Sequence, residues 1–553
     1  KATANVFNAD MVFTPNGDDR ILSLQDEDEL TGLAGRTDNT LNAEIGNRNA
    51  NEGTTATVTP ELNNVQIVNL DWTGNTNIVD LRYSDDIQTL NINKITSDAT
   101  AGAIPVAIHP TLGTGVVVNN ITTAAANLRV ADAADATVNV LFNYQQGVLV
   151  GTETATLELN DVLANSVNQN ALSNGLNVEG FETVNLNALN GVTLNTFSVN
   201  EMETLNVTGS GNLNIAALTA ASGAGAGTAT EFTSIGVAGG IANPAAVGLL
   251  KLDASAFTGN LGLDITSALG GFQDPSNSGA TVHTVVTGGT GDDTFYARAN
   301  VAATSATNRD TIDAGEGTNK LVTTAGVANN ASISNVQTLE LRQQAGAQTV
   351  DFDAFDADLT KVVMRDETSD NAAAAFNLVD LGADLASNGN LVLRHSITET
   401  VAGSDAVINA TVKDATGSSD TVAITVENDL NTGTTFDYTL NATGTDTDNV
   451  ATGAANDADK VENISIADND TESNIVTLTQ VGEHTGTVTL TGVQDAQTFT
   501  VASSLVAGTV DAEAQKSDLR LTVGSATATT KVTQTIKLGE GDDILTFQNI
   551  DDF

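Results

Sequence analysis

The segment that decides the fold is residues 181–207, FETVNLNALNGVTLNTFSVNEMETLNV, which contains one six-residue motif twice. The motif is an apolar residue, Glu or Gln, Thr or Asn, and then an apolar, any and an apolar residue. Its two copies here, Phe181–Leu186 and Met202–Val207, begin 21 residues apart. The alternation in the second half is typical of a strand with one buried face. We therefore expect the first apolar residue to enter the core at a corner just before such a strand.

The same motif recurs along the chain at a spacing that indicates stacked β-structure. Further copies begin at Val65, Ile87, Val336 and Val461. A spacing of 21 or 22 residues between neighbouring copies matches one coil made of strand, corner, strand and corner. Stacked coils would bury a thin core of Val, Leu and Ile. The Asn residues that flank these strands would either form side-chain ladders along the stack or only mark turns.

The composition agrees with a chain that is all β. Of the 553 residues, 40% are hydrophobic, only 4% are aromatic and 6 are Pro. Because β-branched residues run throughout, strands are favoured over disordered coil. The best helical signals are two short stretches, Asp161–Leu172 and Asp353–Val363. We predict irregular β-solenoid or β-roll-like units in tandem, with a possible β-sandwich-like insert at Ala406–Tyr438, where apolar residues alternate.

The charge of the chain excludes one class of partner. There are 21 basic and 69 acidic side chains, which give a net charge of -48. Nucleic acid is excluded as a partner because phosphate binding needs clustered Lys and Arg. No run of about 18 apolar residues occurs, so we predict no transmembrane segment. A chain that is acidic, rich in Asn and Thr and without Cys fits an extracellular bacterial protein better than a cytosolic enzyme.

A longer repeat divides the chain. Gly17-Asp18-Asp19, Gly291-Asp292-Asp293 and Gly541-Asp542-Asp543 each precede an apolar strand. After the first two, Asp28–Leu41 corresponds to Asp310–Leu321. We therefore predict two calcium-binding β-rich units and, after them, the start of a third unit or a C-terminal remnant. The predicted boundaries are 1–275, 276–535 and 536–553.

The motif that carries chemistry is Gly288–Tyr296, GGTGDDTFY, which matches the calcium-binding nonapeptide G-G-x-G-x-D-x-apolar-x at every specified position. The glycines allow a tight turn that aims carbonyl oxygens at one point, and the Asp supplies an anionic oxygen. Calcium needs about six to eight oxygen ligands, so a facing turn must contribute, and the turn with Asp310 and Asp313 is the expected one. A Gly-Asp turn without metal is the alternative. The predicted metal-site residues are Gly17, Asp18, Asp19, Asp28, Asp38, Gly288, Gly289, Gly291, Asp292, Asp293, Asp310, Asp313, Gly315, Gly317, Gly539, Gly541, Asp542 and Asp543.

Acidic pairs of the form Asp-x-Asp also recur. If such a pair lay in an extended segment, its two side chains would point the same way about 7 Å apart and would repel unless a cation were near. For any single pair we favour solvated loop acids, but for the set we expect some metal binding. The pairs begin at Asp26, Asp351, Asp356, Asp446, Asp457 and Asp468.

The sequence contains no recognisable active site. None of the four His has a zinc-type spacing, and neither a thiol nor a Gly-x-Ser-x-Gly elbow is present. The single Trp, Trp72, is interpreted as a core residue more readily than as a sugar contact. A β-helix enzyme acting on polysaccharide would lack a convergent site here, so we predict that the protein is not an enzyme. The His residues are His109, His283, His395 and His484.

Three segments together resemble a known family. GGTGDDTF, DTIDAGEGTNKL and NVQTLEL resemble the type I-secreted, RTX-like bacterial surface-layer (S-layer) proteins of Caulobacter and Campylobacter type. The resemblance implies domains that Ca²⁺ orders and that tile into a paracrystalline coat. It also implies an N-terminal domain that binds lipopolysaccharide and a C-terminal export signal. Two residues depart from the family pattern, since Asn319 stands where Asp is usual and Ala314 where Gly is usual.

We therefore expect a structural extracellular protein that self-assembles with calcium into a surface layer or a related sheet or filament on the bacterial cell. Its main partner would be itself, and cell-surface polysaccharide could be a second partner through a region that is not evident in the chain. The alternative is a stalk or binding region of a large RTX-type adhesin. The long, irregular repeat disfavours this alternative, because adhesin stalks usually show regular sandwich repeats.

Overall fold

The structure is a computed structural model. It describes residues 3–13, 20–26, 28–46, 56–74, 76–96, 102–105, 107–108, 112–169, 180–199, 202–215, 235–236, 249–265, 272–273, 281–297, 301, 303–305, 308–343, 347–366, 374–395, 406–415, 419–428, 435–444, 461–478, 484–493, 497–505, 507–524 and 533–548.

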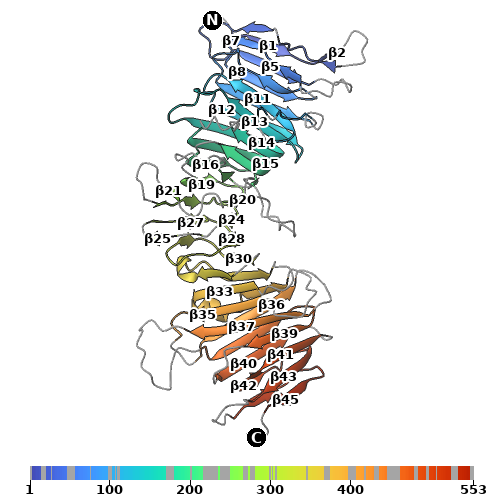
Figure 1. The fold of residues 1–553 in the computed structure, drawn as a ribbon, viewed down its shortest axis with the longest axis vertical. Coiled ribbons are helices and arrows are strands. Elements are labelled where there is room, and N and C mark those ends of the chain that lie inside the picture. The colour runs from blue at the N-terminus through green and yellow to red at the C-terminus, as the bar shows by residue number, and fades with distance from the viewer. Residues whose placement is uncertain are drawn as a thin grey trace. The chain divides into compact units, whose positions relative to one another are not determined.

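The chain forms two compact units (Figure 1). Unit 1 comprises Lys1–Tyr296 and Asp310–Thr318, and unit 2 comprises Ala297–Arg309 and Asn319–Phe553. The predicted boundaries at 275 and 535 stay predictions, because they rest on a sequence repeat and not on compactness. Both units are built almost entirely of strands, as the composition predicts.

Unit 1 contains two ladders of parallel strands, and each strand pairs in register with the corresponding strand one repeat further along the chain. The first ladder is β1 (Val6–Ala9), β5 (Thr40–Ile45), β8 (Ile67–Trp72), β10 (Thr89–Ile95), β12 (Asn127–Ala134), β14 (Thr154–Gln169), β15 (Thr183–Val199), β16 (Thr204–Gly209), β19 (Lys251–Phe257), β23 (Val285–Thr287) and β27 (Thr311–Asp313). The second is β6 (Ala56–Val58), β9 (Thr76–Asp80), β11 (Gly115–Ile121), β13 (Asn139–Tyr144), the later parts of β14 and β15, β17 (Leu213–Ile215), β20 (Leu261–Asp264) and β24 (Thr294–Ala297). Minor strands are β4 (Glu29–Thr31), β7 (Glu61–Asn63), β18 (Ile235–Gly236) and the hairpins β2 (Val12–Phe13) with β3 (Arg20–Ile21) and β21 (Phe272–Gln273) with β22 (Thr281–Val282).

Unit 2 repeats this plan, and its strands alternate between two parallel ladders along the chain. The first ladder is β28 (Lys320–Thr323), β30 (Thr338–Gln343), β32 (Lys361–Asp366), β34 (Leu391–His395), β36 (Thr421–Asn428), β38 (Asn463–Asp468), β40 (His484–Gly492), β42 (Ala507–Asp511) and β44 (Thr535–Lys537). The second is β31 (Ala347–Asp351), β33 (Ala374–Leu381), β35 (Ala406–Val412), β37 (Phe436–Gly444), β39 (Asn474–Leu478), β41 (Thr498–Leu505), β43 (Asp518–Val523) and β45 (Ile544–Phe547). Also present are β25 (Ala303–Ser305), β26 (Asn308–Arg309), β29 (Ser332–Ser334), η3 (Phe352–Ala354) and α1 (Ala383–Ser387).

Three local predictions are wrong. Ala406–Tyr438 is no sandwich-like insert, because β35 and β36 continue the two ladders in parallel register. Asp161–Leu172 is not a helix, since its described part belongs to the long strand β14. Asp353–Val363 holds only the end of η3 and the start of β32. No helix in the described parts of the chain is long and apolar enough to cross a membrane.

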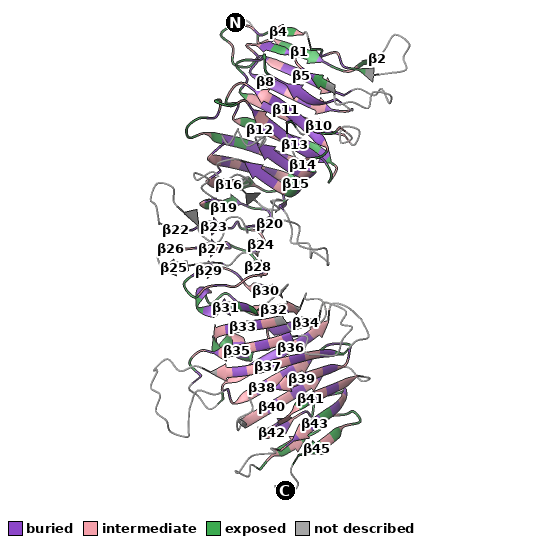
Figure 2. Cartoon of the chain, viewed as in Figure 1, coloured by how far each residue is buried: buried purple, intermediate pink, exposed green. Residues whose placement is uncertain are grey.

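The repeated motif behaves as predicted. Its first residue is buried in all six copies, and a strand of the first ladder begins two residues later. In β8 and β38, for example, half-buried and buried residues alternate along the whole strand, and Figure 2 shows buried and half-buried residues mixed along the strands of both units. Trp72 is fully buried at the end of β8. The six buried first residues are Val65, Ile87, Phe181, Met202, Val336 and Val461.

The flanking Asn residues form ladders, which decides between the two alternatives. Each Asn Nδ2 donates a hydrogen bond to the Asn Oδ1 at the corresponding place one strand earlier. In unit 1 one such ladder runs through Asn8, Asn42, Asn69 and Asn91. In unit 2 another runs through Asn377, Asn409 and Asn441. These ladders bind neighbouring strands to each other outside the apolar core.

Candidate metal centre

The nonapeptide Gly288–Tyr296 forms the turn between β23 and β24, and Phe295 is buried behind it. The carboxylate of Asp293 holds this turn to the one before it. Its Oδ2 accepts from Gly289 N at 2.8 Å, and its Oδ1 accepts from Leu261 N at 3.0 Å. Burial raises the pKa of Asp293 to about 6, although both N–H groups act to lower it. The Asp of the motif therefore already has a structural role in the turn.

The position before Asp293 forms a second contact that repeats from turn to turn. Asn212 Oδ1 accepts from Asn260 N at 3.2 Å, and Asn260 Oδ1 accepts from Asp292 N at 3.0 Å. Asp292 Oδ1 in turn accepts from Thr318 N at 2.8 Å. Four successive turns of unit 1 are thus linked through one equivalent position. Asn and Asp suit this position because a short side chain with an acceptor oxygen can reach the next backbone.

The glycines of the motif are required by the close approach of these turns. A Cβ on Gly291 would lie 2.3 Å from Gly259 O, and one on Gly288 would lie 2.1 Å from Ala314 O. Gly317 has a φ of +93°, and a Cβ there would lie 2.2 Å from Gly291 O. Backbone carbonyl oxygens of neighbouring turns therefore lie directly beside the glycines.

The structure brings the predicted facing turn to the nonapeptide. Gly288 N donates to Asp313 O at 2.7 Å, and the side-chain Oδ1 of Asp313 accepts from Gly315 N at 3.1 Å. Glu316 N donates to Gly289 O at 2.9 Å. The turn that follows β27 therefore stacks on the nonapeptide.

Asp310 lies elsewhere. It precedes β27, at the end of that strand opposite to Asp313, and it is fully buried. Its Oδ1 lies 3.0 Å from His283 Nδ1 and accepts from Thr284 N at 3.3 Å. The structure thus pairs Asp310 with a buried His and not with the nonapeptide turn.

The third copy of the motif, Gly539–Asp543, repeats the geometry in unit 2. Asp543 Oδ1 accepts from Leu519 N at 3.0 Å, as Asp293 does from Leu261. Asp518 Oδ1 accepts from Asp542 N at 2.9 Å. Sequence reasoning missed Asp518, whose place beside Asp542 follows from the register of β43 and β45.

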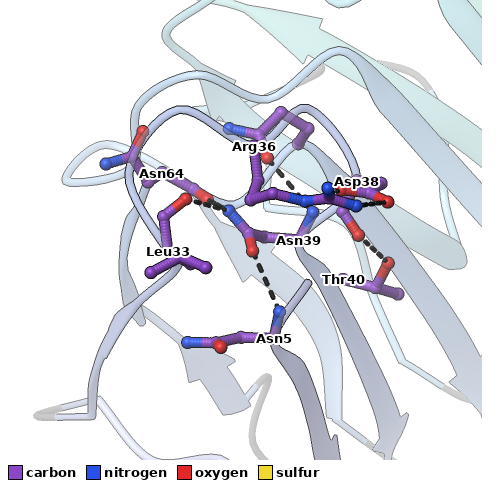
Figure 3. Close-up of polar contacts among 8 residues, drawn as sticks. Asn5, Leu33, Arg36, Asp38, Asn39, Thr40 and Asn64 are labelled. Atoms are coloured by element: carbon purple, nitrogen blue, oxygen red, sulfur yellow. Dashed lines mark hydrogen bonds and ion pairs between the residues drawn. The ribbon is translucent and has the colours of Figure 1, made fainter. Parts of the chain in front are cut away.

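The first copy can be followed only from Asp28 onward. Asp28 Oδ2 accepts from Gln25 N at 2.8 Å, and Asp38 Oδ1 accepts from Arg36 Nε at 2.8 Å. Figure 3 shows Asp38 turned toward Arg36, while Asn39 points toward Asn5, Leu33 and Asn64. The described acids of this copy therefore bind the chain's own N–H groups. Gly17, Asp18 and Asp19 lie outside the described residues.

The oxygen atoms at the nonapeptide are of the kind that calcium binds. Carboxylate oxygens of Asp292, Asp293 and Asp313 lie in the stacked turns together with glycine carbonyls, and calcium prefers such hard oxygen ligands. A carboxylate oxygen that accepts one N–H keeps acceptor capacity for a further contact. Calcium binding at these residues stays a prediction.

A different acidic cluster could hold a metal ion. One carboxylate oxygen each from Asp351, Asp353 and Asp380 lies within 4.8 Å of the other two, the one group of this kind in the described residues. Lys413 Nζ lies 2.6 Å from Asp353 Oδ1 and offsets part of the negative charge. Burial, followed by the charges of Asp380 and Asp353, raises the pKa of Asp351. The sequence indicated the pair Asp351 and Asp353 but not Asp380, which the pairing of β31 with β33 brings to them.

Three of the Asp-x-Asp pairs form turns and not extended segments, so the geometry of two side chains that point the same way does not apply to them. In three pairs the first Asp accepts a hydrogen bond from the backbone N of the second, at 3.0 to 3.1 Å. Burial raises the pKa of Asp468 to about 7. The three pairs are Asp351/Asp353, Asp356/Asp358 and Asp468/Asp470. The pairs at 446/448 and 457/459 lie outside the described residues.

Of the four His residues, His283 is the one whose side chain the structure describes, and it is paired with Asp310. The side chains of His109, His395 and His484 lie outside the described residues. The chain matches no protein-family model, and it matches neither a curated protein nor a solved structure.

Proposed function

We propose that the protein is a structural, non-enzymatic, extracellular protein of a bacterial cell surface that calcium orders and that self-assembles into a layer or filament. In this proposal the two parallel ladders of each unit are walls of a β-solenoid. Support for the solenoid comes from unit 2, where successive strands alternate between the ladders and each pairs with the strand one repeat away. A structural role follows most naturally from a fold that repeats one coil many times.

The observation that carries the calcium part is the stack of glycine turns at Gly288–Asp293 and Asp313–Gly317. Their carbonyls and carboxylates provide the oxygen donors that calcium prefers, and the copy at Gly539–Asp543 has the same contacts to the turn before it. A net charge of -48 gives a second reason, because unscreened repulsion opposes both compaction and contact between copies. Divalent cations within and between copies would remove that repulsion.

Sedimentation velocity of the purified chain tests this proposal. With millimolar calcium we expect fast-sedimenting assemblies, and after chelation we expect a slower species. A matched run with magnesium separates a requirement for calcium from simple charge screening. A single species of unchanged size in all three conditions would instead favour a stalk-like binding protein, and the assembly proposal would fail.

A further inference from the structure

Unit 2 contains a corner whose acidic side chains are buried. The Asp468 corner, defined as residues 468–474, joins β38 to β39. Asp468 is 5% exposed, Asp470 1% and Glu472 7%, and Asn474 is fully buried. Moving carboxylates out of water is costly unless a cation or several donors compensate. Three of them within five residues therefore require an explanation.

The backbone of the corner directs these side chains to one place. Asp468 Oδ1 accepts from Asp470 N at 3.1 Å, and Asp470 Oδ1 accepts from Glu472 N at 2.9 Å. Asn474 Nδ2 donates to Asp468 Oδ1 at 2.8 Å and so closes the corner. Two successive side-chain-to-backbone turns thus place alternate residues on the same, inward side.

Two further polar atoms at this place have no hydrogen-bond partner. Asn474 Oδ1 is buried and has no hydrogen-bond partner. The nitrogen of the same amide, Nδ2, donates to Asp468 Oδ1, so the Asn474 side chain lies against this carboxylate. Tyr438 Oη is also buried without a hydrogen-bond partner. Tyr438 lies on β37, two residues after Phe436, which pairs with Asn474 of the corner, and after burial itself the charges of Asp468 and Asp470 raise its pKa. A buried oxygen that accepts no hydrogen bond calls for an explanation. Here it lies beside carboxylate oxygens, and together these atoms could be the ligands of a cation.

Other buried or clustered acids of unit 2 are compensated differently. Glu340 is 2% exposed and forms ion pairs with Lys320, Arg342 and Arg365. In the described residues, Asp468 forms an ion pair with no Lys, Arg or His. Among the described residues, positive side chains therefore compensate Glu340 but not Asp468.

We propose that Asp468, Asp470, Glu472 and Asn474 bind one calcium ion. All four can bind a metal ion through oxygen, and no His or Cys is among them, which favours calcium over zinc or copper. Three carboxylates supply the negative charge that a tight calcium site needs, and water can complete the six to eight ligands. The site is independent of the glycine turns and needs no assembly, so it goes beyond the function proposed above.

Binding requires a small rearrangement of the corner. The carboxylate oxygens of Asp468, Asp470 and Glu472 do not all lie within 4.8 Å of one another, as those of the Asp351 cluster do. Without a cation, like charges hold them apart. Glu472 has the longest side chain of the three and is the one expected to move onto the ion.

Isothermal titration calorimetry of calcium into the full chain and into two variants, Asp470→Asn and Glu472→Gln, tests this proposal. We expect each variant to bind one calcium fewer per chain than the wild type. Asp384→Asn, which removes a charge from an exposed position of α1, is the matched control and should keep the full number. Folded variants that bind as many ions as the wild type with the same affinity would overturn the proposal.

Terbium luminescence keeps the test decisive if those variants fail to fold. Tb³⁺ replaces Ca²⁺ and emits when a nearby Tyr is excited, and Tyr438 lies on β37, which pairs with the strand that leaves the corner. Tyr438→Phe keeps all four proposed ligands and should lower the emission, whereas Tyr83→Phe, at an exposed Tyr, should not. Equal emission from the Tyr438→Phe variant and the wild type would overturn the proposal. Failure of calcium-dependent assembly would leave both readouts unchanged, so the two proposals fail separately.

Discussion

Asn39 in unit 1 and Asn319 in unit 2 make the same hydrogen bonds. Each side chain is fully buried, and its Nδ2 donates to the carbonyl of a left-handed Asn, at 2.8 Å to Asn64 and at 2.9 Å to Asn335. The two acceptor residues have φ values of 55° and 58°. The long repeat seen in the sequence therefore corresponds to a repeat of structure at these corners.

The correspondence extends to the Gln of the repeated motif. Gln66 Oε1 accepts from Asn39 N at 3.2 Å, and Gln337 Oε1 accepts from Asn319 N at 2.6 Å. This explains why the motif has Glu or Gln at its second position, since a long side chain with an acceptor can reach the preceding corner. Glu182 and Glu462 make the equivalent contact to a backbone N.

The first prediction concerns this corner. Asn319→Ala should lower the free energy of unfolding of unit 2 by about 2 kcal/mol, because it removes a fully buried side chain whose amide donates to the carbonyl of Asn335. Urea unfolding followed by circular dichroism measures the change. Asn330→Ala, at an exposed position, should change stability by less than about 0.5 kcal/mol. Equal stability of the two variants would show that the buried amide does not hold the corner.

The second prediction concerns the stacked glycine turns. Gly291→Ala should destabilise unit 1 by about 2 kcal/mol or more. The new methyl group would lie 2.3 Å from Gly259 O, so the backbone of one of the two turns would have to move. Gly191→Ala is the control, because a Cβ there meets nothing within 4 Å. Thermal unfolding of both variants measures the difference. A Gly291→Ala variant as stable as Gly191→Ala would mean that the turns do not stack this closely.

The third prediction concerns pH. Burial alone would raise the pKa of Glu340, but Lys320 and Arg342 hold it lowered at about 2. Because the folded pKa lies below the ordinary value of 4.5, this carboxylate stabilises the fold above pH 4.5 and loses that effect as the pH falls toward 2. Glu340→Gln should therefore be less stable than the wild type by a few kcal/mol at pH 6, and the difference should shrink toward pH 3.

Unfolding curves of both proteins between pH 6 and pH 3 give this difference. Glu513→Gln, at an exposed surface pair, should follow the wild type throughout. A gap between Glu340→Gln and the wild type that stays constant or widens on acidification would contradict the assigned ion pairs.

The fourth prediction concerns calcium at the nonapeptide. Asp293→Asn should reduce the stabilisation that calcium gives to unit 1, because the variant loses an anionic ligand. One saturated site contributes about 2.7 kcal/mol when free calcium is 100 times its Kd. The rise in melting temperature on adding calcium measures this effect. Asp10→Asn, at an exposed position, should show the full rise in melting temperature. An equal rise in both variants would mean that Asp293 does not bind the calcium ion.

Local patterns of the sequence were enough to predict the corners and the all-β fold. The apolar residue that opens each motif is buried because the chain turns inward there, and this depends only on neighbouring residues. The helix predicted at Asp161–Leu172 failed because its apolar spacing suits either element, and pairing with β13 and β15 selects the strand. The prediction of a sandwich-like insert is wrong because alternation of apolar residues does not reveal whether a strand pairs in parallel.

The parts of the candidate sites that sequence could not supply are contacts between strands. Asp380 joins Asp351, and Asp518 joins Asp542, only through the register of strands whose connections vary in length. The sequence predicts Asp310 and Asp313 in one facing turn, but β27 lies between them, so Asp310 stands at the end of this strand opposite to Asp313. Burial at the Asp468 corner likewise has no signal in the spacing of its acids.

Negative-stain electron microscopy of the purified protein, in millimolar calcium and again after chelation, shows whether assembly of this chain depends on calcium. We expect ordered sheets or filaments in calcium that dissolve when the chelator is added. Isolated particles of the same form in both conditions would contradict it.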